Sequence, residues 1–262
     1  MRLIAILLVV LLCPVLVAGE NPLILTHGFI TLALGPDVCF VAANQTKLDS
    51  LEALQLSLAY DGLYYDGGIL TANSTCGEKG EKQPVFRFSY YGNCYEKGNA
   101  IETYTNRFEA AIKRAKECTG SDKVDIVAHS LGGIITRNYI QTRNNSDIGK
   151  VIFISTPHSG IGAFPIAFFM PSCLFGSLSP FCPSELVEMR TGSPFINSLN
   201  KVDKLNQSTY TLKSSYEFYI PQGSTDALRT DKTASVGCFH DYLFRPLECP
   251  AGYAKIKEFL GS

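Results

Sequence analysis

The sequence has 262 residues, of which 46% are hydrophobic, and its formal net charge is −1. This length and hydrophobic content allow one sizeable α/β core, and nothing in them demands two domains. The near-zero charge offers no basic surface for nucleic acid, so we expect no nucleic-acid partner.

The first residues have the pattern of a cleaved signal peptide. Arg2 precedes a long apolar run, and the small residues Ala18 and Gly19 precede the expected cut. An uncleaved membrane anchor is disfavoured because Pro14 interrupts a run that is short for a span of about 20 apolar residues. We therefore expect residues 1–19 to be removed and residues 20–262 to form a single domain. The mature protein would be secreted, or enter the lumen of the secretory pathway or an organelle reached through it.

The cysteine content agrees with export. Eight of the nine cysteines lie beyond the leader, and an even number in an exported chain indicates disulfides. Two local pairs, Cys173–Cys182 and Cys238–Cys249, would each close a short loop, and the pairing of the other four stays open. No C-x-x-C occurs, so we expect no zinc site. Four sequons are possible glycan acceptors, at Asn44, Asn73, Asn144 and Asn206.

Apolar runs alternate with helical patterns along the chain. Strands are expected at residues 22–29, 84–92, 124–129, 150–156 and 210–221, and residues 66–83 are expected to form a surface loop. Helices are expected at residues 47–62, 99–120, 130–143 and 252–260, with Asn99 as the cap of the second. This order predicts a mostly parallel central sheet with helices on both faces.

The stretch from Lys123 to Ile140, "KVDIVAHSLGGIITRNYI", places Ser130 between a buried strand and a helix. A strand, a sharp turn and a helix are the context of a nucleophile elbow. Ala128 stands at the first glycine position of G-x-S-x-G, and Gly132 keeps the helix side open. The simpler interpretation is that Ser130 only caps the helix.

A serine nucleophile needs a base, and the base needs an acid to hold its tautomer. In folds that carry a nucleophile elbow, the acid and then the histidine follow the serine along the chain. His240 fits best among the four histidines, His27, His129, His158 and His240. Asp226 follows the expected strand 210–221 and is the predicted acid, with Asp231 as its rival and Asp203 less favoured. Backbone donors for the oxyanion are expected at Leu131 and Phe29.

The blocks "LILTHGF", "VDIVAHSLGG", "VIFISTPHSG" and "MRTGSPFINSLN" resemble, in the same order, those of small bacterial-type lipases of the α/β-hydrolase superfamily. The resemblance implies a minimal α/β-hydrolase fold that lacks the two antiparallel opening strands. It also implies hydrolysis of carboxylic esters without a cofactor, with Ser130, Asp226 and His240 as nucleophile, acid and base. Phe29 and Leu131 would then form the oxyanion hole.

The segment from Ser159 to Ser184 contains no charged residue and many aromatic ones. It is either a buried flap or part of an apolar lid, at about residues 159–195, that covers the serine and meets lipid. We prefer the lid, and we expect a monomer that binds a lipid or acyl-ester substrate and contacts a lipid interface transiently.

These features predict a secreted lipase or esterase that works through an acyl-enzyme. The alternatives are a thioesterase, or a phospholipase or glycolipid deacylase, on the same fold. A catalytically inactive binding protein is a further alternative, because a fold alone does not establish chemistry.

Overall fold

The computed structural model describes residues 19–29, 51–76, 81–91, 98–143, 145–163, 165–166, 170–173, 182–221 and 223–262. Several predictions lie outside these residues. They are the signal peptide up to residue 18, the sequons at Asn44 and Asn144, the cysteines Cys39 and Cys94, and parts of the predicted lid segment.

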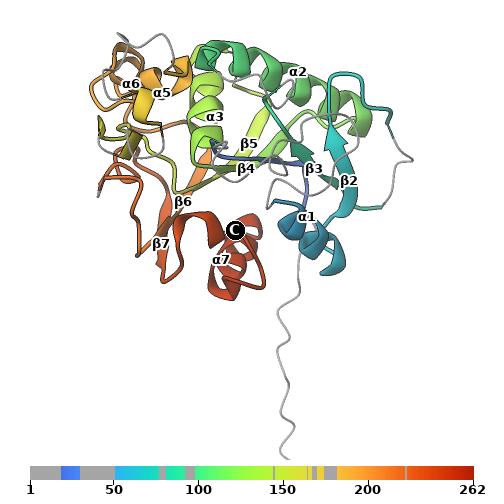
Figure 1. Ribbon diagram of the computed structural model, residues 1–262. Helices are drawn as coiled ribbons and strands as arrows, with labels where there is room; N and C mark the ends of the chain where they lie inside the picture. Colours follow the sequence, from blue (N-terminus) through green and yellow to red (C-terminus); the bar gives the residue numbers. More distant parts are fainter. Residues whose placement is uncertain are drawn as a thin grey trace, which may run out of the picture.

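A seven-stranded sheet in the order β2-β3-β1-β4-β5-β6-β7 forms the centre of the molecule, and every neighbouring pair of strands is parallel (Figure 1). The strands are β1 (Leu23–Thr26), β2 (Tyr65–Leu70), β3 (Pro84–Phe88), β4 (Val124–His129), β5 (Ile148–Ile154), β6 (Ser208–Ser214) and β7 (Lys232–Val236). The predicted fold class is confirmed.

The two outermost strands are those that the sequence pattern did not show. Residues 66–83 were expected to be a loop, yet β2 begins at Tyr65, and β7 had no predicted counterpart. Both strands lie at sheet edges and are mostly exposed or half-buried, so they lack the apolar run that marks a strand covered on both faces.

Helices cover both faces of the sheet. The longer ones are α1 (Leu51–Tyr60), α2 (Ile101–Thr119), α3 (Leu131–Thr142) and α7 (Pro250–Leu260), and the short ones are α5 (Ser184–Glu188) and α6 (Pro194–Leu199). Figure 1 shows α2 and α3 on one face of the sheet and α1 and α7 on the other. The predicted helices are therefore present, with ends shifted by a few residues.

Strand β1 shows how the sheet separates two hydrophobic cores. Its leucines, Leu23 and Leu25, pack into the core that includes residues of α1 and α7, whereas Ile24 packs into the core beneath α2 and α3. All three side chains are completely buried. Because successive side chains of a strand point to opposite faces, a strand covered on both sides must be apolar throughout. Burial of each such side chain is worth about 1.5–3 kcal/mol.

The N-terminus of α2 is held by acids from a distant segment. We expected Asn99 to cap this helix, but the N-cap is Ala100, which makes no side-chain cap. Instead, the Gly98 amide donates to Glu185 Oε2 at 2.9 Å, and the Ile101 amide donates to Glu188 Oε2 at 2.6 Å. Negative charge is favourable at a helix N-terminus, so these α5 carboxylates supply what a local cap would.

The described part of segment 159–195 packs against the core beneath α2 and α3. Ile166, Cys173, Leu186 and Met189 are buried there. The two ends of the segment lie together, because the Ile161 amide donates to the Met189 carbonyl at 2.9 Å. The base of the predicted lid is thus a firmly packed part of the fold.

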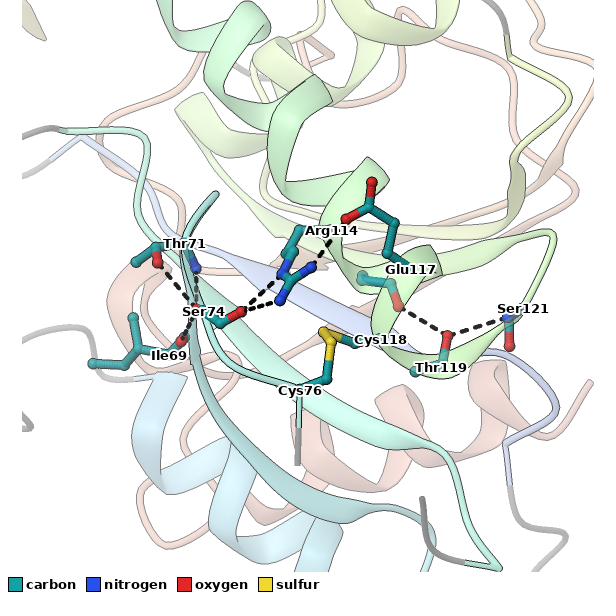
Figure 2. Close-up of a disulfide and its surroundings, with 10 residues drawn as sticks. Ile69, Thr71, Ser74, Cys76, Arg114, Glu117, Cys118, Thr119 and Ser121 are labelled. Carbon is teal, nitrogen blue, oxygen red and sulfur yellow. Dashed lines mark hydrogen bonds and ion pairs between the residues drawn. A yellow bond between two sulfur atoms is a disulfide. The ribbon is translucent and has the colours of Figure 1, made fainter. Parts of the chain in front are cut away.

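Both predicted disulfides are confirmed, Cys173–Cys182 and Cys238–Cys249. A third bridge, Cys76–Cys118, links the segment after β2 to the last turn of α2 (Figure 2). Beside it, Arg114 Nε donates to the Ser74 carbonyl at 2.8 Å. This bridge fastens the edge strand β2 to the helix layer.

Two surface properties bear on the predicted export. The sequon asparagines Asn73 and Asn206 are exposed, as a glycan acceptor must be. Within the described residues, no helix is long and apolar enough to cross a bilayer.

Loop length predicts unequal contributions of the disulfides to stability. Cys76–Cys118 spans 42 residues and Cys173–Cys182 spans 9. Chain-entropy arguments give about 4 kcal/mol for the longer loop and about 2.6 kcal/mol for the shorter one. We expect Cys76→Ser/Cys118→Ser to lower the free energy of unfolding in urea more than Cys173→Ser/Cys182→Ser does. The reverse order would contradict this account.

Candidate active site

Ser130 lies in the sharp turn that the sequence predicted, between the last residue of β4, His129, and the first residue of α3, Leu131. Its φ of 50° and ψ of −118° are a conformation that non-glycine residues rarely adopt. Such a conformation costs about 1–3 kcal/mol and persists only where the surroundings enforce it. The Ser130 amide donates to the Ile154 carbonyl at 2.9 Å, which ties the turn to β5.

Glycine is required on the helix side of the turn because α3 approaches the sheet closely. A Cβ on Gly132 would lie 2.5 Å from the carbonyl oxygen of His27, and one on Gly133 would lie 2.0 Å from Thr156 Oγ1. These distances are below van der Waals contact. The two glycines of "HSLGG" therefore allow the strand and helix backbones to meet at Ser130.

His240 lies beside this turn and is oriented by a carboxylate. Its Nδ1 is 2.9 Å from Glu217 Oε2, and its ring centroid is 4.6 Å from that of His129. Since a carboxylate only accepts, Nδ1 carries the proton and Nε2 is left as the basic nitrogen. The Cys238–Cys249 bridge closes the loop that carries His240, as predicted.

The Glu217 side chain is only 11% exposed, and several donors hold it. Burial raises the pKa of this carboxyl, but hydrogen bonds from His240, the Tyr219 amide and the Ser155 hydroxyl outweigh it, so the pKa is lowered overall. The Tyr219 amide lies 3.0 Å from Glu217 Oε1. Ser155 itself has a φ of 39°, and among described non-glycine residues only it and Ser130 have a positive φ. Glu217 therefore stays ionised and can hold an imidazole or an imidazolium.

The prediction that Asp226 lies against His240 is wrong. Asp226 is exposed, and its two carboxylate oxygens accept from Lys213 Nζ at 2.8 and 2.7 Å. The rival, Asp231, accepts from the Thr209 amide at 2.9 Å, near the start of β6. That end of β6 is remote from the carboxyl edge at which Ser130 lies. The carboxylate that contacts His240 is therefore that of Glu217, and His240 in turn lies against His129, the residue before Ser130.

Sequence reasoning missed Glu217 because of where β6 ends. Residues 210–221 were expected to form one strand, so an acid was sought beyond residue 221. Strand β6 ends at Ser214, and Glu217 follows in the next turn. The available signal was that an ionisable residue, Glu217, lies inside the run "YEFYI", which directly follows two serines.

The predicted oxyanion residues border Ser130. Leu131 begins α3 directly after the serine. A Cβ on Gly28 would lie 2.9 Å from Ser130 Cβ, so the chain leading into Phe29 lies against Ser130. The two predicted donors therefore flank the same side chain from separate elements.

The other histidines have structural contacts. The ring nitrogens of His27 contact the Gly28 carbonyl at 2.7 Å and Ser89 Oγ at 2.9 Å. His158 is buried with its ring edge-on to Phe153. His27 is therefore hydrogen-bonded within the fold, and His158 is packed in the interior.

His129, His240 and Asp241 are a group whose possible ligand atoms lie within 4.8 Å of one another. A metal ion bound by this group would occupy a ring nitrogen of His240.

Residues 87–219, which are 133 of the 262, match the family model of palmitoyl protein thioesterases. The chain belongs to the palmitoyl protein thioesterase family. No curated protein sequence matches the chain significantly.

Solved structures with the same fold include bacterial esterases. A crystal structure of the lin2722 gene product from Listeria innocua aligns with a TM-score of 0.58 at 15% identity, covering 92% of this chain and 93% of that one. The metagenome-derived lipolytic enzymes LipS and LipT give 0.58 at 12%, covering 93% and 95%. Est1E from Butyrivibrio proteoclasticus gives 0.54 at 13%, covering 93% and 90%.

These comparisons confirm the predicted superfamily. The chain is a hydrolase of the α/β-hydrolase fold, and its family is that of the thioesterases rather than the bacterial-type lipases that its blocks resemble. The match ends at Tyr219 and so includes both Ser130 and Glu217.

Substitution of Glu217 and substitution of Asp226 are predicted to differ strongly in their effect on activity. We expect Glu217→Gln to lower kcat at least about a hundredfold, since loss of the acid leaves His240 without its orienting partner. Asp226→Asn is the matched control and should keep nearly full activity, because the exposed Asp226 carboxylate accepts from Lys213 and not from His240. Steady-state kinetics of both variants decide the assignment. Comparable losses, or a larger loss in Asp226→Asn, would contradict it.

Buried histidines predict a loss of stability in weak acid. Burial lowers the pKa values of His129 and His158 well below the ordinary value of 6.5. Below that value the unfolded chain binds protons that the folded chain does not, so the free energy of unfolding rises with pH and levels off above it.

Urea denaturation between about pH 5.5 and 7.5 measures this effect. Each buried neutral histidine adds a slope of up to about 1.4 kcal/mol per pH unit below its ordinary pKa. His158→Asn, compared with the wild type, should reduce the slope. A flat profile across this range would show that the two rings titrate normally in the folded protein.

Proposed function

We propose that this protein hydrolyses long-chain acyl thioesters, with Ser130 as nucleophile, His240 as general base and Glu217 as the acid that orients it. The observation that carries the proposal is the His240–Glu217 contact beside the strained Ser130 turn. The family match supports the thioester as the substrate class.

The chemistry follows from this arrangement. Ser130 Oγ attacks the carbonyl carbon of the thioester while His240 Nε2 takes the hydroxyl proton. The backbone N–H groups of Leu131 and Phe29 stabilise the negative charge on the carbonyl oxygen. When the intermediate collapses, the C–S bond breaks and the thiolate receives the proton from His240. Water, deprotonated by His240, then attacks the acyl-enzyme and releases the fatty acid and Ser130.

Exposed aromatic side chains around the site support an apolar substrate. Tyr216 and Phe218 flank Glu217, and Phe239 and Tyr242 flank His240, and all four are exposed. Contiguous exposed apolar surface of this kind usually marks a binding surface. Segment 159–195 would add a lid, as its uncharged composition suggests. Because each buried CH₂ of an acyl chain is worth about 0.8 kcal/mol, these surfaces would favour long chains.

The proposal includes the cellular setting. Three disulfides within the described residues are typical of an oxidising compartment. With the signal-peptide pattern of residues 1–19, they support action in the lumen of the secretory pathway, in an organelle reached through it, or outside the cell. Asn73 and Asn206 would carry glycans there.

An oxoester is the second candidate substrate, because the blocks around Ser130 resemble those of lipases. The same groups would cleave it, with an alcohol in place of the thiol. An alcohol is a much weaker acid than a thiol, whose pKa is about 8.5, so its departure depends more on the proton that His240 delivers.

A fluorophosphonate probe tests the nucleophile. We expect the wild type to be labelled at Ser130, because the probe phosphonylates serines activated by a base. Ser130→Ala should show no label in intact-protein mass spectrometry, and Ser224→Ala, a buried serine that donates to the Gly160 carbonyl, should keep the label. Label that persists in Ser130→Ala would sink the assignment of Ser130, and a wild type that takes no label would favour a binding protein of the same fold.

Matched substrates test the leaving group. Palmitoyl thioester and oxoester analogues with the same acyl chain should differ in kcat/KM, with the thioester preferred. Glu217→Gln should reduce oxoester cleavage by a larger factor than thioester cleavage, since an alkoxide needs the proton from His240 in order to leave, whereas a thiolate can leave before it takes that proton. A wild-type preference for the oxoester would assign the protein as an esterase or lipase.

A further inference from the structure

Two side chains anchor the carbonyl oxygen of the peptide between Gly28 and Phe29. We propose that Tyr90 is a positioning residue that holds this peptide so that the Phe29 N–H faces the nucleophile. The inference rests on the proposed function, because it concerns the oxyanion hole of the same site.

Two side chains bind the carbonyl oxygen of Gly28. Tyr90 Oη donates to it at 2.6 Å, and His27 Nδ1 lies 2.7 Å from it. Because a carbonyl oxygen only accepts, Nδ1 of His27 is the protonated nitrogen. His27 Nε2 then accepts from Ser89 Oγ, at 2.9 Å. Both lone pairs of the Gly28 oxygen are thus occupied by donors from the end of β1 and the segment after β3.

The geometry of the peptide bond carries this orientation to Phe29. No described peptide bond is cis, and in a trans peptide the C=O and the following N–H point in opposite directions. With the Gly28 oxygen held on Tyr90 and His27, the Phe29 N–H must point away from both. Gly28 itself packs against Ser130, since a Cβ built on it would lie 2.9 Å from Ser130 Cβ. We infer that the Phe29 N–H is directed to this side.

An anchor is needed because the residue is glycine. A side chain at position 28 would collide with Ser130, so the site requires glycine. Glycine, however, has the freest backbone of all residues. Rotation of the Gly28–Phe29 peptide would turn a carbonyl oxygen, in place of a donor, toward the developing oxyanion. The bond from Tyr90 opposes that rotation.

Tyr90 is well suited to this task. It is completely buried, with its ring stacked on His27 at 4.2 Å and tilted against Tyr104 at 5.1 Å between centroids. Burial raises the pKa of its hydroxyl well above the ordinary value, so the hydroxyl stays protonated and donates throughout the working pH range.

Tyr90→Phe tests the inference, with Tyr104→Phe as the matched control. Both changes delete one buried hydroxyl from the same aromatic cluster, but the Tyr104 hydroxyl donates to Glu185 Oε1, at 3.4 Å. Loss of a whole oxyanion donor costs about 10²–10³-fold in kcat. Since His27 still holds the Gly28 oxygen, we expect Tyr90→Phe to lower kcat about tenfold or more with KM nearly unchanged. Tyr104→Phe should leave kcat within about twofold of the wild type.

Two measurements separate positioning from a general loss of structure. Active sites are counted by end-point titration with the fluorophosphonate, so that unfolded protein does not lower kcat. An alkyl boronic acid, whose tetrahedral adduct occupies the oxyanion hole, should lose affinity in Tyr90→Phe by the same factor as kcat. The affinity for the fatty acid product should not change.

The outcomes distinguish this inference from the proposed function. If Tyr90→Phe matches Tyr104→Phe in kcat and in boronic acid affinity while Ser130→Ala is inactive, the positioning role is refuted and the proposed function stands. If both the kcat and the fatty acid affinity of Tyr90→Phe fall together, the hydroxyl maintains the pocket as a whole, and the inference also fails. If the wild type neither reacts with the probe nor cleaves acyl substrates, the proposed function itself is refuted.

Discussion

The strained turn at Ser130 is the constraint that the surrounding structure must satisfy. A serine with a positive φ persists only if contacts with its neighbours stabilise the fold by more than the backbone strain destabilises it. Here the buried strand β4 precedes it, the Ile154 carbonyl holds its amide, and Gly132 and Gly133 let α3 begin directly against the sheet. The turn places one hydroxyl at the carboxyl edge of the sheet and at the N-terminus of α3, which favours negative charge there.

The parallel sheet brings the remaining parts of the candidate site to the same edge. The carboxyl ends of parallel strands all lie on one side of the sheet, and the groups concerned follow β1, β4, β5, β6 and β7. They also support one another in series: Ser155, after β5, donates to Glu217, which holds His240, which lies against the residue before Ser130. Each strand end thus contributes one contact to a continuous network.

The likeness to solved hydrolases concerns this framework rather than the surface. Identities of 12–15% over more than nine-tenths of the chain accompany the same fold. The features that would select a substrate lie instead among exposed side chains, such as the rings beside Glu217 and His240. The family match to palmitoyl protein thioesterases therefore bears on the choice of acyl substrate more than the structural neighbours do.

The sequence by itself determined the fold class, the Ser130 turn, the position of His240 and two disulfides, because each depends on a local pattern. An apolar run, a small residue at a sharp turn and a short Cys–Cys spacing are all visible in neighbouring residues. Only the tertiary structure decided the carboxylate. Glu217 was hidden in an apolar run, and Asp226 stood where an acid was expected. The position at which β6 ends depends on its pairing with β5 and β7, which are distant in the chain. The same pairing decides that Lys213 contacts Asp226.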